Sequence, residues 1–283
     1  MQLQQGNSGC KLYLLKERDT FFVRKFSASE TYNHRLVAQA KKQQSYSNRN
    51  DLPFDVPKVL RIDDGYFDME HFTSISVLEY LLDFGKPASD HIYQTMVDFI
   101  STNITSAEYC PLDCNILEQK ADSIFENISP ESESLLPFSR KDLSEYINSH
   151  DGIEIPISSC HGDLTFSNVL IGENNKVVVI DFLDTFYESP LQDIVKIRQD
   201  TKYSWWSVLG EEKTISENTR TMIQMQHLDQ RFDRAFMKYS FYVDLYTLFQ
   251  TMSMLRILPY VGNHLQRKVL VYNSLRDLRG QWT

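Results

Sequence analysis

The chain opens with short runs in which apolar and polar residues alternate, a pattern that predicts a β-rich segment. Residues 11–26 (KLYLLKERDTFFVRKF) hold two such runs around the polar turn 17–20, as a β-hairpin would. Residues 58–62 and 65–69 predict two further strands after a loop at 51–57 that contains two prolines. We therefore expect about four short strands before residue 71.

A helix is predicted between the hairpin and the third strand. Leu36, Ala40 and Gln43 follow one another at helical spacing and would share one face. Ser27, with Glu30 three residues later, fits a capping box that would begin this helix.

After His71 the apolar spacing changes from the period of a strand to that of a helix. The two patterns together predict an α+β protein with a small lobe over 1–71 and a larger, mostly helical lobe over 72–283. In the second lobe the sequence predicts helices over 76–84, 89–104, 141–149 and from residue 190 onward, a polar loop at 129–137, and strands within 157–183.

Composition narrows the class of protein. The 283 residues are 42% hydrophobic, without the long apolar run that a transmembrane helix needs, and the first residues do not resemble a secretory signal. The net charge of −9, without a basic run, disfavours nucleic acid and anionic membranes as partners. The four cysteines lack the spacing of a disulfide framework or a zinc site. We expect a cytoplasmic protein with reduced thiols.

The chemistry concentrates in one stretch of the larger lobe. His161-Gly162-Asp163 is followed five residues later by Asn168, and thirteen residues after that by Asp181 at the end of a β-branched run. A hairpin that turns at residues 172–175 would bring Asn168 and Asp181 side by side. Phosphoryl transfer needs a carboxylate that orients the acceptor hydroxyl, together with oxygen ligands for Mg²⁺. A helix cap, a turn and a strand end would each explain one of these residues alone, but the joint spacing favours the chemical interpretation.

These residues resemble the aminoglycoside phosphotransferase and choline kinase family, which has the protein-kinase-like bilobal fold. The resemblance implies ATP and Mg²⁺ as cofactors. It implies that Asp163 is the catalytic base, that Asn168 and Asp181 are magnesium ligands, and that His161 supports the loop. Asp193 resembles a family position that stabilises the same loop.

The resemblance also extends to the small lobe, as the nucleotide-binding part. It implies roles for Gly6, Asn7, Ser8 and Gly9 in a phosphate-covering loop, for Lys25 at the nucleotide phosphates, and for Glu70 and Phe72 at the adenine hinge. Arg24 is the alternative to Lys25, because strand alternation places the two on opposite faces. The usual Glu partner of this lysine is missing from the helix, so that either Glu30 or Gln39 would position it or the pair is absent.

The acceptor side is less specific. Asp184, Tyr203 and Trp206 are candidates for substrate binding, where aromatic rings would hold a cationic amino alcohol or stack on a sugar. Aromatic residues at helical spacing are equally typical of a hydrophobic core. The identity of the acceptor, the choice between ATP and GTP, and the oligomeric state are not encoded in any motif.

The sequence thus predicts an ATP- and Mg²⁺-dependent phosphotransferase that acts on a hydroxyl of a small metabolite: a sugar, polyol or amino alcohol. The alternative is a non-catalytic nucleotide-binding scaffold of the pseudokinase type, which the missing Glu partner favours. A protein kinase is disfavoured because Phe182-Leu183 follows Asp181 where a Phe-Gly pair would be expected. A metal hydrolase would need further His or Asp ligands.

Overall fold

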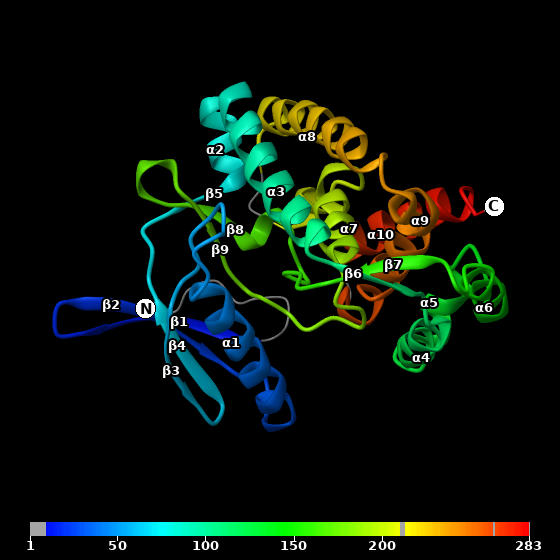
Figure 1. Ribbon diagram of the computed structural model, residues 1–283, viewed down its shortest axis with the longest axis horizontal. Helices are drawn as coiled ribbons and strands as arrows, with labels where there is room; N and C mark the ends of the chain where they lie inside the picture. Colours follow the sequence, from blue (N-terminus) through cyan, green and yellow to red (C-terminus); the bar gives the residue numbers. More distant parts are fainter. Residues whose placement is uncertain (1–9, 210–212, 263, 283) are drawn as a thin grey trace.

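The computed structural model describes residues 10–209, 213–262 and 264–282. The smaller lobe is built on an antiparallel sheet of the strands β1, β2, β4 and β3, in that order (Figure 1). Their bounds are Lys11–Glu17, Thr20–Phe26, Tyr66–Glu70 and Val59–Asp63. The predicted hairpin and the two following strands are therefore confirmed to within one residue at either end.

One helix, α1 (Asn33–Ser47), packs against this sheet. Its buried residues include the predicted Leu36, Ala40 and Gln43. The predicted capping box is wrong: Glu30 begins a separate 3-10 turn, and the Ser27 hydroxyl donates to the Ser29 carbonyl. The chain enters the helix through that turn, so the two side chains never face each other across a helix end.

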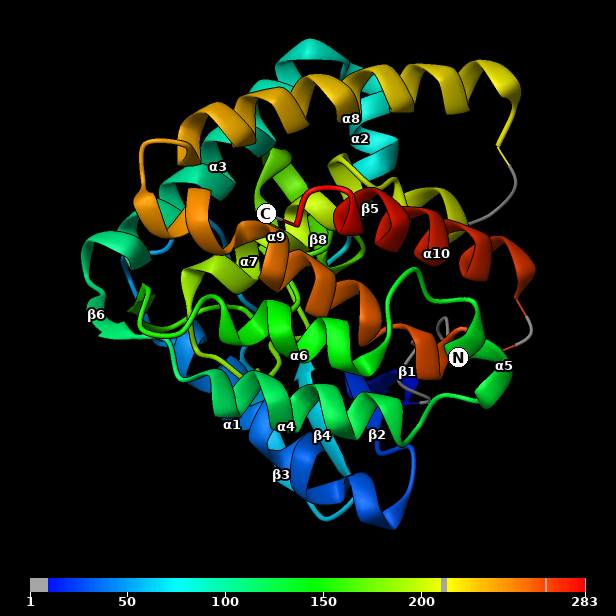
Figure 2. The ribbon, with the colours of Figure 1, turned by 90° about the vertical axis from the view of Figure 1, so that its right-hand side faces the viewer.

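The larger lobe is mostly helical. Figure 2 shows α8 running across one side of this lobe, with α10 and α9 on another. At the centre lies α7, in which every residue is buried, packed against α3, α8 and α9. The helices are α2 (Val77–Phe84), α3 (Lys86–Thr105), α4 (Cys114–Phe125), α5 (Pro130–Ser134), α6 (Arg140–Asn148), α7 (Pro190–Thr201), α8 (Ile215–Phe236), α9 (Ser240–Leu255) and α10 (Leu265–Arg279).

Two small antiparallel sheets complete the larger lobe. They are β5–β8–β9 (Ile75–Ser76, Val169–Ile171, Val177–Val179) and β6–β7 (Glu108–Pro111, Glu154–Ile157). The hairpin β8–β9 turns through Gly172–Asn175, as the sequence predicts. It is the element that brings the chemistry-bearing residues together.

The predicted loop at 129–137 is wrong in part, because it contains the short helix α5. Ser129 accepts a hydrogen bond from the Ser132 amide, and Pro130 occupies the first turn of the helix. Serine at the cap and proline at the first helical position are favourable signals for a helix start. Here they outweigh the polarity of the segment.

The α+β, two-lobed architecture predicted from the sequence is confirmed. Within the residues that the structure describes, none of the helices combines the length and the apolar character needed to cross a bilayer. The four cysteines are free thiols.

Candidate active site

The loop that precedes β8 is held by His161. Its side chain is fully buried, its Nε2 lies 2.8 Å from the Ile180 carbonyl oxygen, and its Nδ1 accepts the Asp163 amide at 3.1 Å. This pattern fits a neutral imidazole that carries its proton on Nε2. Burial lowers the pKa of His161 from its ordinary value of 6.5 to about 4.

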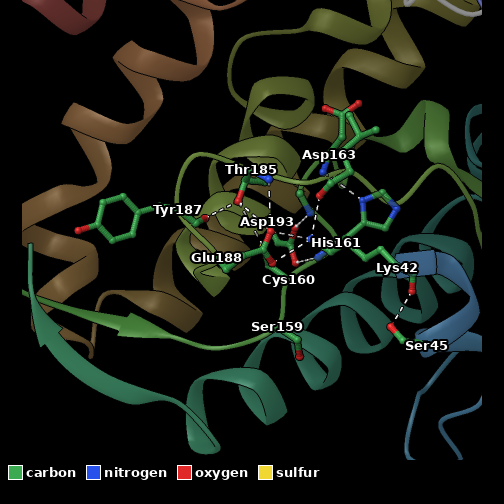
Figure 3. A network of polar contacts seen from close by, with 12 residues as sticks. Lys42, Ser45, Ser159, Cys160, His161, Asp163, Thr185, Tyr187, Glu188 and Asp193 are labelled. Carbon is green, nitrogen blue, oxygen red and sulfur yellow. Dashed lines mark hydrogen bonds and ion pairs between the residues drawn. The ribbon is translucent and has the colours of Figure 1, made fainter. Parts of the chain in front are cut away.

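Asp193, on α7, holds the same loop through its carboxylate. Its carboxylate oxygens accept the backbone amides of His161 at 2.8 Å and Gly162 at 2.9 Å. Burial raises the pKa of Asp193 to about 7, while the two amides oppose this rise. Figure 3 shows Asp193 at the centre of the network, beside His161, Cys160 and Glu188. Asp193 therefore stabilises this loop, as the family resemblance implied.

Gly162 allows the loop to turn sharply. Its φ is +89°, and a Cβ atom there would collide with the Leu183 carbonyl. Only glycine tolerates both the left-handed backbone and this close approach. The segment that follows Asp181 is thereby packed directly on the segment that leads to Asp163.

Asp163 projects from this loop with its side chain 28% exposed. Its Oδ1 lies 3.1 Å from Nζ of the buried Lys196. Burial alone would raise the pKa of Asp163, but the Lys196 ammonium outweighs it, and the pKa lies below its usual value. Asp163 is thus an accessible carboxylate that stays ionised.

Asn168 and Asp181 meet across the hairpin, as the spacing predicts. Val169 pairs with Val179 in the β8–β9 register, and the Ile180 amide donates to the Asn168 carbonyl at 3.0 Å. The Asn168 Nδ2 donates to the Asp163 carbonyl at 2.8 Å and approaches Oδ2 at 3.2 Å, which directs its Oδ1 elsewhere. An amide oxygen and a carboxylate, both hard donors, stand beside the proposed base.

Lys25 reaches this group from the other lobe. Although only 3% exposed, its Nζ lies 2.8 Å from the Asp181 Oδ1 and 3.3 Å from the Gln39 Oε1. Burial would lower the pKa of Lys25, but the Asp181 carboxylate outweighs it and raises the pKa. Arg24 instead pairs with Asp68 at 2.6 Å. The structure therefore brings Lys25 to the site and Gln39 to Lys25, while the exposed Glu30 lies in its own turn.

The remaining predicted positions are distributed differently. Gly6, Asn7, Ser8 and Gly9 lie outside the described residues. Glu70 ends β4, where its amide donates to the Lys58 carbonyl, and Phe72 follows it. Tyr203 and Trp206 are each 7% exposed in the hydrophobic core, where the Tyr203 hydroxyl lies 3.5 Å from Asp277. The exposed Asp184 lines a cavity.

Sequence reasoning missed two cations beside the site, the buried Lys196 and the half-buried Lys42. Lys196 follows Asp193 by three residues on α7, so both lie on one helix face, a spacing that offered the only signal. Lys42, on α1, donates to the Leu183 carbonyl at 2.8 Å and to Glu188 at 2.9 Å. It ties α1 of the smaller lobe to the segment that follows Asp181.

This geometry can be set beside known proteins. Residues 129–218, which include Asp163, Asn168 and Asp181, match the model of the Phosphotransferase enzyme family, APH. The chain resembles this family. No curated protein matches the chain significantly in sequence.

Solved structures show the same fold over nearly the whole chain. An ethanolamine kinase of Plasmodium vivax is 13% identical, with a TM-score of 0.57 over 98% of this chain and 82% of its own. A thermostable mutant of aminoglycoside phosphotransferase APH(4)-Ia, bound to AMP-PNP and hygromycin B, is 14% identical, with a TM-score of 0.62 over 98% and 92%. The protein-kinase-like fold is confirmed, and the family match and these neighbours together support a phosphotransferase of the small-molecule kinase type.

The burial of His161 leads to a testable pH dependence. The unfolded chain binds a proton on this ring near pH 6.5 and the folded chain only near pH 4, so stability falls as the pH is lowered through that window. From pH 7 to pH 5 the loss from this group is about 2 kcal/mol. Urea unfolding at both pH values should show that much extra loss for the wild type relative to His161→Gln, a difference in which other titrating groups such as Asp193 cancel.

Equal losses in the two proteins would contradict a buried neutral His161. Following the His161 ring resonance by NMR tests the same point without a variant. A pKa near 6.5 would also contradict it.

Proposed function

We propose that this protein transfers the γ-phosphate of ATP to a hydroxyl of a small metabolite, with Mg²⁺ as cofactor. The observation that carries the proposal is the convergence of Asp163, Asn168, Asp181 and Lys25 from both lobes. The match of this segment to a phosphotransferase model supports it. So does the fold shared with a structure that holds AMP-PNP.

The reaction follows from the roles of these side chains. The acceptor hydroxyl oxygen forms a bond to the γ-phosphorus while the bond from that phosphorus to the β,γ-bridging oxygen breaks. ADP leaves with the electron pair, and the hydroxyl proton passes to the Asp163 carboxylate and then to water. Lys196 keeps Asp163 ionised before transfer, and Asp163 orients the hydroxyl for in-line attack.

The residues present fit a magnesium ion. Asn168 Oδ1 and the Asp181 carboxylate would hold it, since carboxylate and amide oxygens are the ligands that Mg²⁺ prefers. When bound, Mg²⁺ neutralises charge on the phosphates. Lys25 already lies against the Asp181 carboxylate, so a cation is stabilised at this position. Within the described chain no cluster of three or more His, Cys, Asp or Glu side chains offers a competing metal site.

The other nucleotide contacts belong to the same proposal. Residues 1–71 would form the nucleotide-binding lobe, with Gly6–Gly9 over the phosphates and Glu70 and Phe72 beside the base. Residues 72–283 would carry catalysis and acceptor binding. A cytoplasmic location fits the free thiols, because disulfides are rare in that compartment.

A non-catalytic scaffold is the second candidate, and Gln39 is the observation that favours it. A neutral amide binds the Lys25 ammonium more weakly than a carboxylate would. The Asp181 carboxylate, however, also binds the Lys25 ammonium, at 2.8 Å. The intact set around Asp163 favours catalysis over a scaffold.

Thermal unfolding with Mg·ATP, Mg·GTP and MgCl₂ alone tests the proposal. We expect Mg·ATP to raise Tm, since ligand at 100 times its Kd stabilises by about 2.7 kcal/mol. ADP release should then require an acceptor from a panel of sugars, polyols, amino alcohols and hydroxy acids. If the protein binds nucleotide but releases no ADP with any acceptor of the panel, the scaffold is favoured. No nucleotide binding at all would contradict both candidates.

A further inference from the structure

A cavity of about 340 Å³ opens between the two lobes, next to the candidate active site. Arg35 comes from α1, Lys120 from α4 and Arg256 from the residue directly after α9. Asp184 and Phe186, from the segment after Asp181, line the same cavity. The volume is that of a site for a small metabolite.

The cavity is positively charged in a protein whose net charge is −9. Its lining carries the cations Arg35, Lys120 and Arg256 against the single carboxylate of Asp184. Among the described residues, none of these three cations forms an ion pair within 4.0 Å. Arg35 and Arg256 stack instead on the rings of Tyr32 and Phe186. The cavity therefore gathers positive charge that no ion pair among the described residues neutralises.

Arg256 has, in addition, a buried nitrogen that makes no hydrogen bond within the described chain. Its Nη1 atom is buried and has no hydrogen-bond partner among the described residues. Burial lowers the pKa of Arg256; the Asp163 carboxylate opposes this and Arg35 adds to it. A buried guanidinium nitrogen without a partner is costly, so its retention points to a ligand that supplies the acceptor.

Lys120 is also in an environment that disfavours its positive charge. Burial lowers the pKa of Lys120, and the positive charges of Arg256 and Arg35 lower it further. Like charges held together in a partly desolvated site repel one another. An anion between them would remove this repulsion, whereas a cationic amino alcohol would add to it.

The cavity also lies where an acceptor must be. Asp184 is three residues after Asp181, and Arg256 is close enough to Asp163 to act on its titration. Asp163, Asn168 and Asp181 do not line the cavity, but a molecule that fills it would lie close to this group. The guanidinium groups would hold its far end while a hydroxyl faces Asp163.

We propose that the phosphate acceptor is an anion, a hydroxy acid, sugar acid or phosphate ester whose acidic group is held by Arg35, Lys120 and Arg256. This inference rests on the proposed kinase function and narrows its substrate class. Arginine is suited to the task because its planar fork binds carboxylate and phosphate through two parallel hydrogen bonds. The exposed Asp184 would orient the acceptor's hydroxyl groups.

Acceptors of similar size and different charge test the proposal. One set is D-glucuronate, D-glucose and D-glucosamine. The other is D-glycerate, glycerol, 3-amino-1,2-propanediol and glycerol 3-phosphate, which separates carboxylate from phosphate. We expect the acidic members alone to raise Tm at constant ionic strength and to give the higher kcat/KM in each set that is phosphorylated. A preference for neutral or amino members, or no Tm shift with any acid, would overturn the inference.

The variants Arg256→Gln and Arg35→Gln separate acceptor binding from nucleotide binding. Each should raise the KM or Kd for the acidic probe about 10- to 100-fold, the effect of one lost charged hydrogen bond, with the KM or Kd for Mg·ATP unchanged. Arg256→Lys should recover part of the loss. Lys41→Gln, an exposed change on the same helix as Arg35, is the matched control and should have no effect.

The two proposals fail in distinguishable ways. An equal loss of affinity for Mg·ATP in Arg256→Gln would assign these cations to the nucleotide phosphates and would overturn the inference alone. Wild-type protein that binds Mg·ATP but no acid also overturns the inference and leaves the kinase proposal standing. Protein that binds no nucleotide overturns the proposed function itself.

Discussion

Replacing Asp163 with alanine is expected to lower kcat by about 10²- to 10⁴-fold, the usual contribution of a positioned general base, with the Kd of Mg·ATP nearly unchanged. Asp163 contacts Lys196 and Asn168 and would face the acceptor hydroxyl, but the nucleotide would be held by Asp181 and Lys25. Steady-state ADP release and equilibrium nucleotide binding measure the two effects separately.

The alanine also leaves Lys196 buried without its carboxylate, which would cost stability. Asp163→Asn keeps the shape of the side chain and serves as the matched variant, read against Asp244→Ala, an exposed change on α9. A wild-type rate in Asp163→Asn would show that the base is elsewhere. Loss of nucleotide binding in a folded Asp163→Asn protein would place Asp163 in the nucleotide site.

The second large effect is expected at Asp181. Removing its charge should lower kcat/KM by about 10³-fold or more, because a metal ion supplies several kcal/mol of transition-state stabilisation. We choose Asp181→Asn because the backbone φ at residue 181 is +63°. Asn tolerates this left-handed conformation better than Ala. Lys25 would also lose its partner at 2.8 Å.

Activity measured against MgCl₂ concentration separates these effects. In Asp181→Asn the half-saturating concentration of Mg²⁺ should rise strongly, while Asp244→Asn should follow the wild type. An unchanged Mg²⁺ dependence combined with low activity would mean that Asp181 acts only by holding Lys25. Full activity at the wild-type Mg²⁺ requirement would exclude it as a ligand.

The parts of the fold that the sequence predicted are those set by local patterns. Alternation over residues 11–26 and the turn at 172–175 produced the two hairpins, since register follows from side chains that must face one core. The spacing of Asn168 and Asp181 followed from the second hairpin. The sequence interpretation was wrong for the capping box at Ser27 and in part for the loop at 129–137, because capping depends on which backbone amide each hydroxyl meets.

The parts that could not be predicted depend on packing between elements that are far apart in the sequence. Lys196 reaches Asp163 because α7 is buried and packs against the loop. No sequence motif indicates that this helix is buried on all sides. Arg35, Lys120 and Arg256 come together from three elements that are far apart in the sequence. Aromatic residues such as Tyr203 and Trp206, which look alike in a sequence whether they form a core or a site, are buried in the core.

The central claim is that Asp163, Asn168, Asp181 and Lys25 form one site for a magnesium-bound nucleotide. A crystal structure of the wild-type protein with Mg²⁺ and AMP-PNP tests it most directly. The account predicts a metal ion bound by Asn168 and Asp181, the phosphates beside Lys25, and the γ-phosphate facing Asp163. A nucleotide bound in another part of the molecule, or a metal ion held without Asp181, would contradict it.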